Sequence, residues 1–412
     1  MAMLNKPSSR WAYLRGNIGV MLLSSGLWNL AGAMTWPFYS LYVLELGGSH
    51  LDIGLISALS AVFKIAPTFI GGYLADSLGR KKMVYTMSLG LAVNQIIMGF
   101  APSYRYLYIA AVIEALLSGL RQPSLIAIVA DSTQPENRAF SFALWQVVPP
   151  LFGLFSPYVI GIQMDRHGII TAMRWAYLFV FSMALAASLM RYRYLEETLT
   201  DEEATGEPAA DPRKFIRDFR ETFRRLPVQL WVFLLIDFIF TFAWALTEPY
   251  FVTYAKEVVG LSAAQWGLTS TLFTVVRTFM LLPAARASDR HGRLKFILAT
   301  MFLWPVSFIF FVNSVGFYGV LMAQVLMAVF DSIGNPAWDA LFVDLSPKEH
   351  RGRFNAVANV SWSLIWGAGN ITGGAIYQNQ SKKNPFIAGA GLFVIGALLT
   401  LLRVKEPEER EE

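Results

Sequence analysis

The chain has 412 residues, of which 55% are hydrophobic and only 15% are charged, and it contains no cysteine. Soluble domains carry about 25% charged residues, so this composition excludes an ordinary soluble protein. The lack of cysteine excludes disulfides, thiolate metal sites and cysteine nucleophiles. The formal net charge is +5, and the placement of the basic residues assigns that excess to membrane topology and not to nucleic-acid binding.

The hydrophobic residues are grouped into blocks of about the 20 residues that a helix needs to span a bilayer. We therefore predict an all-α membrane protein with twelve transmembrane helices. In chain order, the expected spans are 17–44, 52–75, 83–101, 105–130, 139–163, 174–195, 229–255, 266–287, 296–312, 317–343, 354–377 and 385–402.

The basic residues are distributed unevenly between alternate loops. Twenty-five of the 34 Lys and Arg residues lie in the segments that include both termini, and six lie in the loops of the opposite side. Cytoplasmic loops are enriched in Lys and Arg. This bias predicts a multi-pass protein of the cell membrane with both termini in the cytoplasm.

The longest polar interruption, 196–228, divides the chain. Its first part is acidic, but after Asp211-Pro212 an apolar face flanked by basic residues is formed by Phe215, Phe219, Phe223 and Leu226. Such a pattern is typical of a helix that lies against anionic headgroups. We expect an N-terminal six-helix bundle (1–195), a cytoplasmic linker with an amphipathic helix (196–228) and a C-terminal six-helix bundle (229–412).

An internal repeat relates the two halves. Asp76-x-x-Gly79-Arg80 recurs as Asp289-x-x-Gly292-Arg293, at an offset of 213 residues. The same offset relates further glycines, prolines, acids and in-span cations: Gly54 and Gly267, Lys64 and Arg277, Pro123 and Pro336, Asp131 and Asp344, Gly161 and Gly374. Because one repeat carries six spans, both copies keep the same orientation, and the repeat is parallel.

The segment Gly72-Tyr73-Leu74-Ala75-Asp76-Ser77-Leu78-Gly79-Arg80-Lys81-Lys82 resembles the loop signature between the second and third helices of the major facilitator superfamily. Residues 286–295 resemble the degenerate second copy. The resemblance covers the whole chain. It implies two pseudo-symmetric six-helix bundles, a central cavity lined mainly by helices 1, 4, 7 and 10, and transport by alternating access.

The chain departs from the family pattern at several positions. Ser77 stands where the family has a basic residue, and Ala111 stands where many proton-coupled members carry an arginine. The helix-five motif of exporters is present only in part, as Gly153, Ser156-Pro157 and Gly161. This partial helix-five motif favours export.

The signature loops are expected to act mechanically. In the family they latch the two halves together in one access state. The resemblance therefore implies a conformational latch that consists of Asp76, Gly79, Arg80 and Asp131, with Asp289, Arg293 and Asp344 as its symmetry-related copy. The alternative is a pair of solvated turns whose charges only obey the topology rule.

Ionisable side chains inside the spans are the strongest site candidates. A charge near the bilayer centre costs about 2.5–3.5 kcal/mol on insertion scales, so such residues usually face a cavity or a partner. Helical spacing places several of them on faces with polar and aromatic residues. The candidates for substrate or proton binding are Asp237, Asp331, Arg121, Glu114, Lys64, Arg277, Trp36, Trp244, Trp338 and Asn335. The competing interpretation is a set of salt bridges that hold the bundles together.

We conclude from the sequence that the protein is a secondary active transporter of a small organic solute. Proton-coupled efflux of amphipathic, drug-like compounds is the preferred function, and uptake or exchange of a small anionic metabolite is the alternative. A membrane enzyme or a channel is a remote alternative, since no catalytic constellation is present and a channel would not need two signature loops. The lack of a phosphate-binding Walker motif argues against ATP drive, and the four histidines, all in loops, make no metal site. We expect no cofactor or metal, no nucleic-acid partner, and a monomer.

Overall fold

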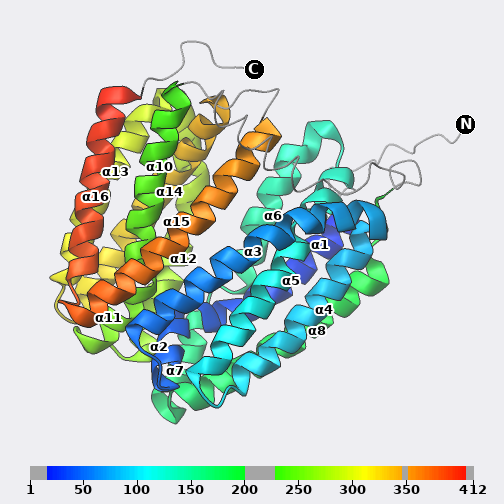
Figure 1. Cartoon of the computed structure of the whole chain (residues 1–412), viewed down its shortest axis with the longest axis horizontal. Helices are drawn as coiled ribbons and strands as arrows, with labels where there is room; N and C mark the ends of the chain where they lie inside the picture. Colours follow the sequence, from blue (N-terminus) through cyan, green and yellow to red (C-terminus); the bar gives the residue numbers. More distant parts are fainter. Residues whose placement is uncertain (1–15, 200–227, 346–350, 405–412) are drawn as a thin grey trace, which may run out of the picture. The chain divides into compact units, whose positions relative to one another are not determined.

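The computed structural model describes residues 16–199, 228–345 and 351–404, apart from a few side chains within these helices. The described residues form helices and turns without strands (Figure 1). The first repeat contains α1 (Asn17–Thr35), α2 (Tyr39–Glu45), α3 (His50–Leu78), α4 (Arg80–Gly99), α5 (Tyr104–Asp131), α6 (Arg138–Phe152), α7 (Ser156–His167) and α8 (Ile169–Tyr194). The second contains α10 (Val228–Thr247), α11 (Phe251–Glu257), α12 (Ala263–His291), α13 (Arg293–Val312), α14 (Gly316–Leu345), α15 (Arg351–Asn379) and α16 (Asn384–Arg403).

Helices occupy all of the expected spans, which confirms the all-α class. Ten helical segments among the described residues are long and apolar enough to cross a membrane. The other two expected spans correspond to α4 and α15, which carry more polar residues, such as the buried Asn94 and Gln95 of α4 and the buried Asn370 of α15. That these two helices cross the bilayer stays a prediction.

Three expected spans are not single α-helices. The first is interrupted by a 3₁₀ turn at Trp36–Phe38, and the seventh by one at Glu248–Tyr250. The fifth is divided between α6 and α7 after the pair Pro149-Pro150. Proline lacks the amide hydrogen that continues an α-helix, and each interruption contains or closely follows a proline.

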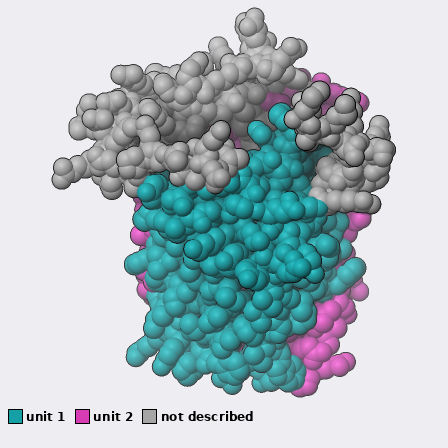
Figure 2. All heavy atoms as spheres, turned by 90° about the vertical axis from the view of Figure 1, so that its right-hand side faces the viewer, with its two compact units in different colours: residues 1–36, 63–156, 171–209 teal, residues 37–62, 157–170, 210–412 magenta. Residues whose placement is uncertain are grey.

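The chain forms two compact units, which Figure 2 shows in teal and magenta. Unit 1 consists of residues 1–36, 63–156 and 171–209, and unit 2 of residues 37–62, 157–170 and 210–412. The segments 37–62 and 157–170 of the first repeat thus belong to unit 2, so the units do not follow the expected boundary at every point. The predicted amphipathic helix of the linker lies outside the described residues.

Each unit has its own buried apolar cluster. In unit 1 it includes Ile18, Met21, Val84 and Ile128 from α1, α4 and α5. In unit 2 a cluster around Phe233 joins α10 to α13, α14, α15 and α16. In a bilayer such contacts stabilise by close van der Waals packing, because lipid tails are as apolar as the side chains. Polar side chains beside these apolar clusters are therefore candidates for a functional role.

Candidate functional site

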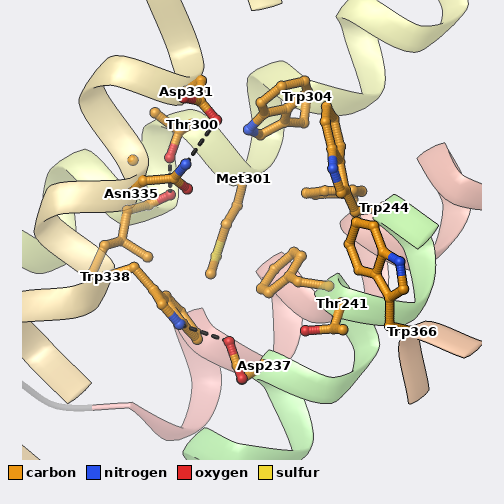
Figure 3. Close-up of a pocket in the computed structure, with 14 residues that line it drawn as sticks. Asp237, Thr241, Trp244, Thr300, Met301, Trp304, Asp331, Asn335, Trp338 and Trp366 are labelled. Atoms are coloured by element: carbon orange, nitrogen blue, oxygen red, sulfur yellow. Dashed lines mark hydrogen bonds between the residues drawn. The ribbon is translucent and has the colours of Figure 1, made fainter. Parts of the chain in front are cut away.

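Unit 2 contains a pocket with a volume of about 240 Å³. Its walls come from α10, α13, α14, α15 and α16, and two carboxylates and four tryptophans are among its lining residues (Figure 3). The lining consists of Asp237, Phe240, Thr241, Trp244, Ile297, Thr300, Met301, Trp304, Asp331, Gly334, Asn335, Trp338, Trp366 and Phe393. A largely apolar pocket with a few convergent polar groups is typical of a small-molecule site.

Asp237 of α10 is held by indole groups. Its side chain is buried, with a residue exposure of 8%. Trp338 Nε1 donates a hydrogen bond to Asp237 Oδ1 over 2.8 Å, and Trp362 Nε1 donates to Oδ2. Both donors are indole N–H groups, and together they orient the carboxylate.

Asp331 of α14 is held by a cation and an amide. Arg277 Nε of α12 donates to Asp331 Oδ2, and Asn335 Nδ2, one turn along α14, donates to Oδ1 over 2.7 Å. The Asp331 side chain is 14% exposed, whereas that of Arg277 is 48% exposed. Arg277 thus balances the charge of Asp331.

The aromatic walls are fixed by ring contacts. Trp244 meets Trp304 edge to face, with centroids 4.8 Å apart. Trp338 stacks on Phe233 with centroids 4.3 Å apart, and its other neighbour Phe240 approaches edge-on. The faces of aromatic rings carry negative partial charge and attract cations.

The structure brings five of the predicted site residues to this pocket: Asp237, Trp244, Asp331, Asn335 and Trp338. The sequence analysis missed the contribution of α13, which supplies Ile297, Thr300, Met301 and Trp304. The family resemblance directed attention to helices 1, 4, 7 and 10. The helical spacing of Thr300 and Trp304, one polar and one aromatic residue on a single face, was the available signal.

Of the other predicted site residues, Arg277 lies in unit 2 and pairs with Asp331, whereas the remaining four lie in unit 1. Glu114 of α5 accepts hydrogen bonds from Asn94 Nδ2 at 3.0 Å and from Gln95 Nε2 at 3.2 Å. Arg121, two turns further along α5, lies over the Trp28 ring at 4.7 Å from its centroid. Lys64 of α3 is exposed on the surface of its unit. None of these residues is among the residues that line the pocket of unit 2.

Trp36 is not part of either group of residues. It opens the 3₁₀ turn after α1 and is 72% exposed. It belongs to unit 1 and does not line the pocket of unit 2.

The first signature loop forms a charge cluster in unit 1. Arg80 Nη2 lies 3.3 Å from Asp76 Oδ1, and Arg80 Nη1 forms an ion pair with Asp131. Gly79 separates α3 from α4 with φ of +98°, a conformation that residues with a side chain rarely adopt. The expected contact between Arg80 and Asp131 is therefore present.

Glu197 completes this cluster, and the sequence analysis missed it. Its carboxylate accepts hydrogen bonds from the backbone amides of Arg80 and Lys81, and each of these bonds is 3.0 Å long. It thus lies at the positive N-terminus of α4. A Cβ added to Gly79 would lie 2.7 Å from Glu197 Oε2. The close approach of this carboxylate is thus a second reason, besides the positive φ, why glycine is needed at this position.

The second signature loop is described only in part. Gly292 has the same φ of +98° as Gly79. The side chains of Asp289 and Asp344 lie outside the described residues. The symmetry-related latch that these two residues form with Arg293 stays a prediction.

Comparison with known proteins gives a family match over both halves. The family model of the Major Facilitator Superfamily matches residues 21–267 and again residues 233–412. Multidrug resistance protein MdtG of Klebsiella pneumoniae (strain 342) is 25% identical, with coverage of 95% of this chain and 94% of the relative. The protein of the same name from Salmonella arizonae is also 25% identical, over 93% of this chain and 94% of its own.

Solved structures of transporters share the fold. A peptide transporter POT in complex with sulfate has a TM-score of 0.73 and 17% identity, and the match covers 94% of both chains. The nucleoside transporter NupG (D323A mutant) has a TM-score of 0.72 and 12% identity, over 94% of this chain and all of that one. The human organic anion transporter MFSD10 has a TM-score of 0.65 and 18% identity, over 93% and 98% of the two chains.

Proposed function

The chain belongs to the major facilitator superfamily, and from that premise we propose that it exports cationic, amphipathic compounds in exchange for protons. The pocket of unit 2 is the proposed binding site. The observation that carries this proposal is the combination of Asp237 and Asp331 with four tryptophans in the lining of one pocket. The name of the MdtG relatives, multidrug resistance protein, supports export of drug-like compounds.

The proposed selectivity for cations follows from the charges of the pocket. Asp237 contacts neutral indole donors, and Asp331 shares its charge with Arg277. A cation placed over a tryptophan face gains about 0.5–2 kcal/mol, with the larger value where water is excluded. An anion in the same pocket would face two carboxylates and the negative faces of the rings.

The proposed coupling uses competition for a carboxylate. A proton and a cationic compound each neutralise the same negative charge, so that binding of one favours release of the other. Asp237 is the preferred carrier because its hydrogen-bond donors, Trp338 and Trp362, can stay in place in both protonation states. Asp331 is the second candidate, and its contact with Arg277 would tighten when no cation is bound.

The mechanical part of the proposal follows the family. Two six-helix bundles, 1–195 and 229–412, move against each other in the cell membrane, with both termini and the amphipathic linker in the cytoplasm. The clusters around Arg80 and Arg293 act as latches, and the protein works as a monomer. The ion pairs of Arg80 with Asp76 and Asp131 support the first latch.

A second candidate function is transport of a small anionic metabolite. The observation in its favour is that Lys64 and Arg277, which are related by the repeat offset, are both exposed on their units. Arg277, however, is already paired with Asp331, and an anion would have to compete with this carboxylate. Export of cations requires no such competition and no role for Lys64. Cation export therefore remains the preferred function.

Ligand binding by purified full-length protein tests the proposed substrate class. Tetraphenylphosphonium should bind, and Asp237→Asn should weaken its binding about tenfold, which corresponds to about 1.4 kcal/mol. Lys64→Gln is the matched control and should bind the cation as the unaltered protein does. Preferential binding of an anionic dye, with the loss confined to Lys64→Gln and Arg277→Gln, would contradict cation export and favour the anion alternative.

A further inference from the structure

Arg191 of α8 is the largest fully buried side chain among the described residues, with a residue exposure of 2%. Its guanidinium donates hydrogen bonds only to serine hydroxyls of α1 and α4 within the described chain: Nε to Ser24 at 2.9 Å, Nη1 to Ser88 at 2.7 Å and Nη2 to Ser25 at 3.4 Å. All of these groups belong to unit 1. Serine hydroxyls satisfy the donors of Arg191 but do not neutralise its charge.

A second arginine shares one of these serines. Arg121 Nη1 donates to Ser88 Oγ over 3.3 Å, so that one hydroxyl accepts hydrogen bonds from two guanidinium groups. The remaining hydrogen of that hydroxyl is free to donate. Arg121 Nε is buried and has no hydrogen-bond partner among the described residues. Unpartnered donors in a buried position call for an acceptor.

The acid of this cluster does not balance its bases. Lys64, Arg121 and Arg191 supply three positive charges, whereas Glu114 supplies one negative charge. Glu114 takes its hydrogen bonds from two amides, and no ion pair joins it to these cations in the described part of the chain. These four side chains therefore carry an excess of two positive charges. Buried charges are normally paired, so this excess favours the binding of an anion.

In the second repeat, the cation at the position equivalent to Lys64 has its charge balanced by an acid. Arg277, the counterpart of Lys64, contacts Asp331. The residue of the first repeat that corresponds to Asp331 is Ser118, and the residues of the second repeat that correspond to Arg121 and Arg191 are Gly334 and Val404. Unit 1 therefore lacks the acid and has gained two arginines.

We propose that unit 1 binds a small monovalent anion, either chloride or a simple carboxylate ion, at the guanidinium groups of Arg121 and Arg191 beside Ser88. Arginine donors and a hydroxyl hydrogen match the lone pairs of such an ion. Lys64, an exposed cation of the same unit, adds positive charge to this cluster. This site is separate from the pocket of unit 2, and the inference does not depend on the compound that the protein transports.

Titration of the purified full-length protein with sodium chloride or sodium acetate tests this site. Ionic strength is held constant with sodium gluconate, whose anion is much larger than chloride or acetate, and the unfolding temperature is recorded. A saturable rise in the unfolding temperature is expected for the small anions. The two titrations show which of the ions binds more tightly.

Variants locate the effect. Arg121→Gln should abolish the saturable rise, and Arg191→Gln should weaken the apparent affinity about tenfold or more, the effect of losing one charged contact. Arg277→Gln, at the counterpart of Lys64, is the matched control and should keep the rise. If Arg191→Gln does not fold, Ser88→Ala replaces it and should weaken the affinity. No saturable rise in the unaltered protein, or an equal rise in Arg121→Gln, would overturn the proposal.

Discussion

Gly54 and Gly267, which the repeat relates, each bring the backbones of two helices together in the same way within unit 2. A Cβ on Gly54 of α3 would lie 2.3 Å from the carbonyl oxygen of Asn370 in α15. A Cβ on Gly267 of α12 would lie 2.2 Å from the carbonyl oxygen of Pro157 in α7. Pro157 and Asn370 are themselves separated by the offset of 213 residues. Both contacts join a helix of one repeat to a helix of the other.

Polar contacts at the ends of these helices follow the same symmetry. Gln378 Oε1 accepts a hydrogen bond from the amide of Leu51 over 3.0 Å. Asp165 Oδ2 accepts one from the amide of Ala264, also over 3.0 Å. The offset relates Leu51 to Ala264 and Asp165 to Gln378. Two equivalent contacts between the repeats are therefore built from a close glycine and a capping side chain.

Gly54→Leu and Gly267→Leu should each separate one of these helix pairs. A backbone oxygen at 2.2–2.3 Å cannot move aside as a flexible side chain would, so we expect transport to fall about tenfold or more. Cysteines introduced at positions 51 and 378 into this cysteine-free chain should cross-link less efficiently in Gly54→Leu. Gly391→Leu is the control, since a Cβ there meets open space. Unchanged cross-linking in Gly54→Leu would contradict this account.

The latch around Arg80 should influence conformation more than folding. Asp76→Asn removes one of the carboxylates that contact Arg80, while Asp131 and Glu197 keep α4 in place. We expect the protein to insert normally, with a shifted balance between its two access states and slower transport. Spectroscopic distances between labels on the two halves should reveal the shift. The same distance distribution in Asp76→Asn and in the unaltered protein would show that Arg80 and its partners are not a latch.

The aromatic wall of the pocket should contribute to affinity for cations. Trp304→Ala removes a ring that lines the pocket and also removes the edge contact to Trp244. Tetraphenylphosphonium should bind with about 1–2 kcal/mol less free energy, the range of a desolvated cation–π contact and an aromatic pair. Trp304→Phe should restore most of the loss. Equal loss in both variants would point to packing and not to contact with the ligand.

Arg277 and Lys64 should differ although the repeat relates them. Arg277→Gln leaves Asp331 with the amide of Asn335 as its remaining donor, so we expect a loss of about 0.2–1 kcal/mol in the free energy of unfolding, as for a partly exposed ion pair. Lys64 forms no comparable ion pair among the described residues, and Lys64→Gln should be neutral or stabilising. Thermal unfolding of the two variants side by side measures the difference. A larger loss in Lys64→Gln would reverse this assignment.

The helices and the repeat could be predicted from the sequence because each depends on short local patterns of residues. Apolar blocks set the spans, and the offset of 213 residues paired Gly54 with Gly267 before any contact was known. The repeat did not show that these glycines are contact points, since the partner backbones at Pro157 and Asn370 are far away in sequence. Helical spacing likewise places Asp237 and Trp244 on one face of a helix, but it does not show that the face of α13 with Thr300 and Trp304 lines the same pocket.

Arg191 and Glu197 show where such reasoning fails. Arg191 ends an apolar block, where positive charge is expected on topological grounds alone. Its burial depends on serines from α1 and α4, more than 100 positions away. Glu197 follows a helix in a run of acidic residues that resembles a solvated linker. Its role at the N-terminus of α4 follows only from the tertiary fold.

Gradient-driven transport tests the central claim most directly. Proteoliposomes with an acidic lumen and a neutral exterior should accumulate tetraphenylphosphonium as protons leave. The account predicts that Asp237→Asn abolishes the part of uptake that depends on the pH gradient, whereas Lys64→Gln retains it. Asp237 is the residue whose charge the cation and the proton are proposed to share. Equal uptake with and without the gradient, or full gradient-driven uptake by Asp237→Asn, would contradict proton-coupled export through this pocket.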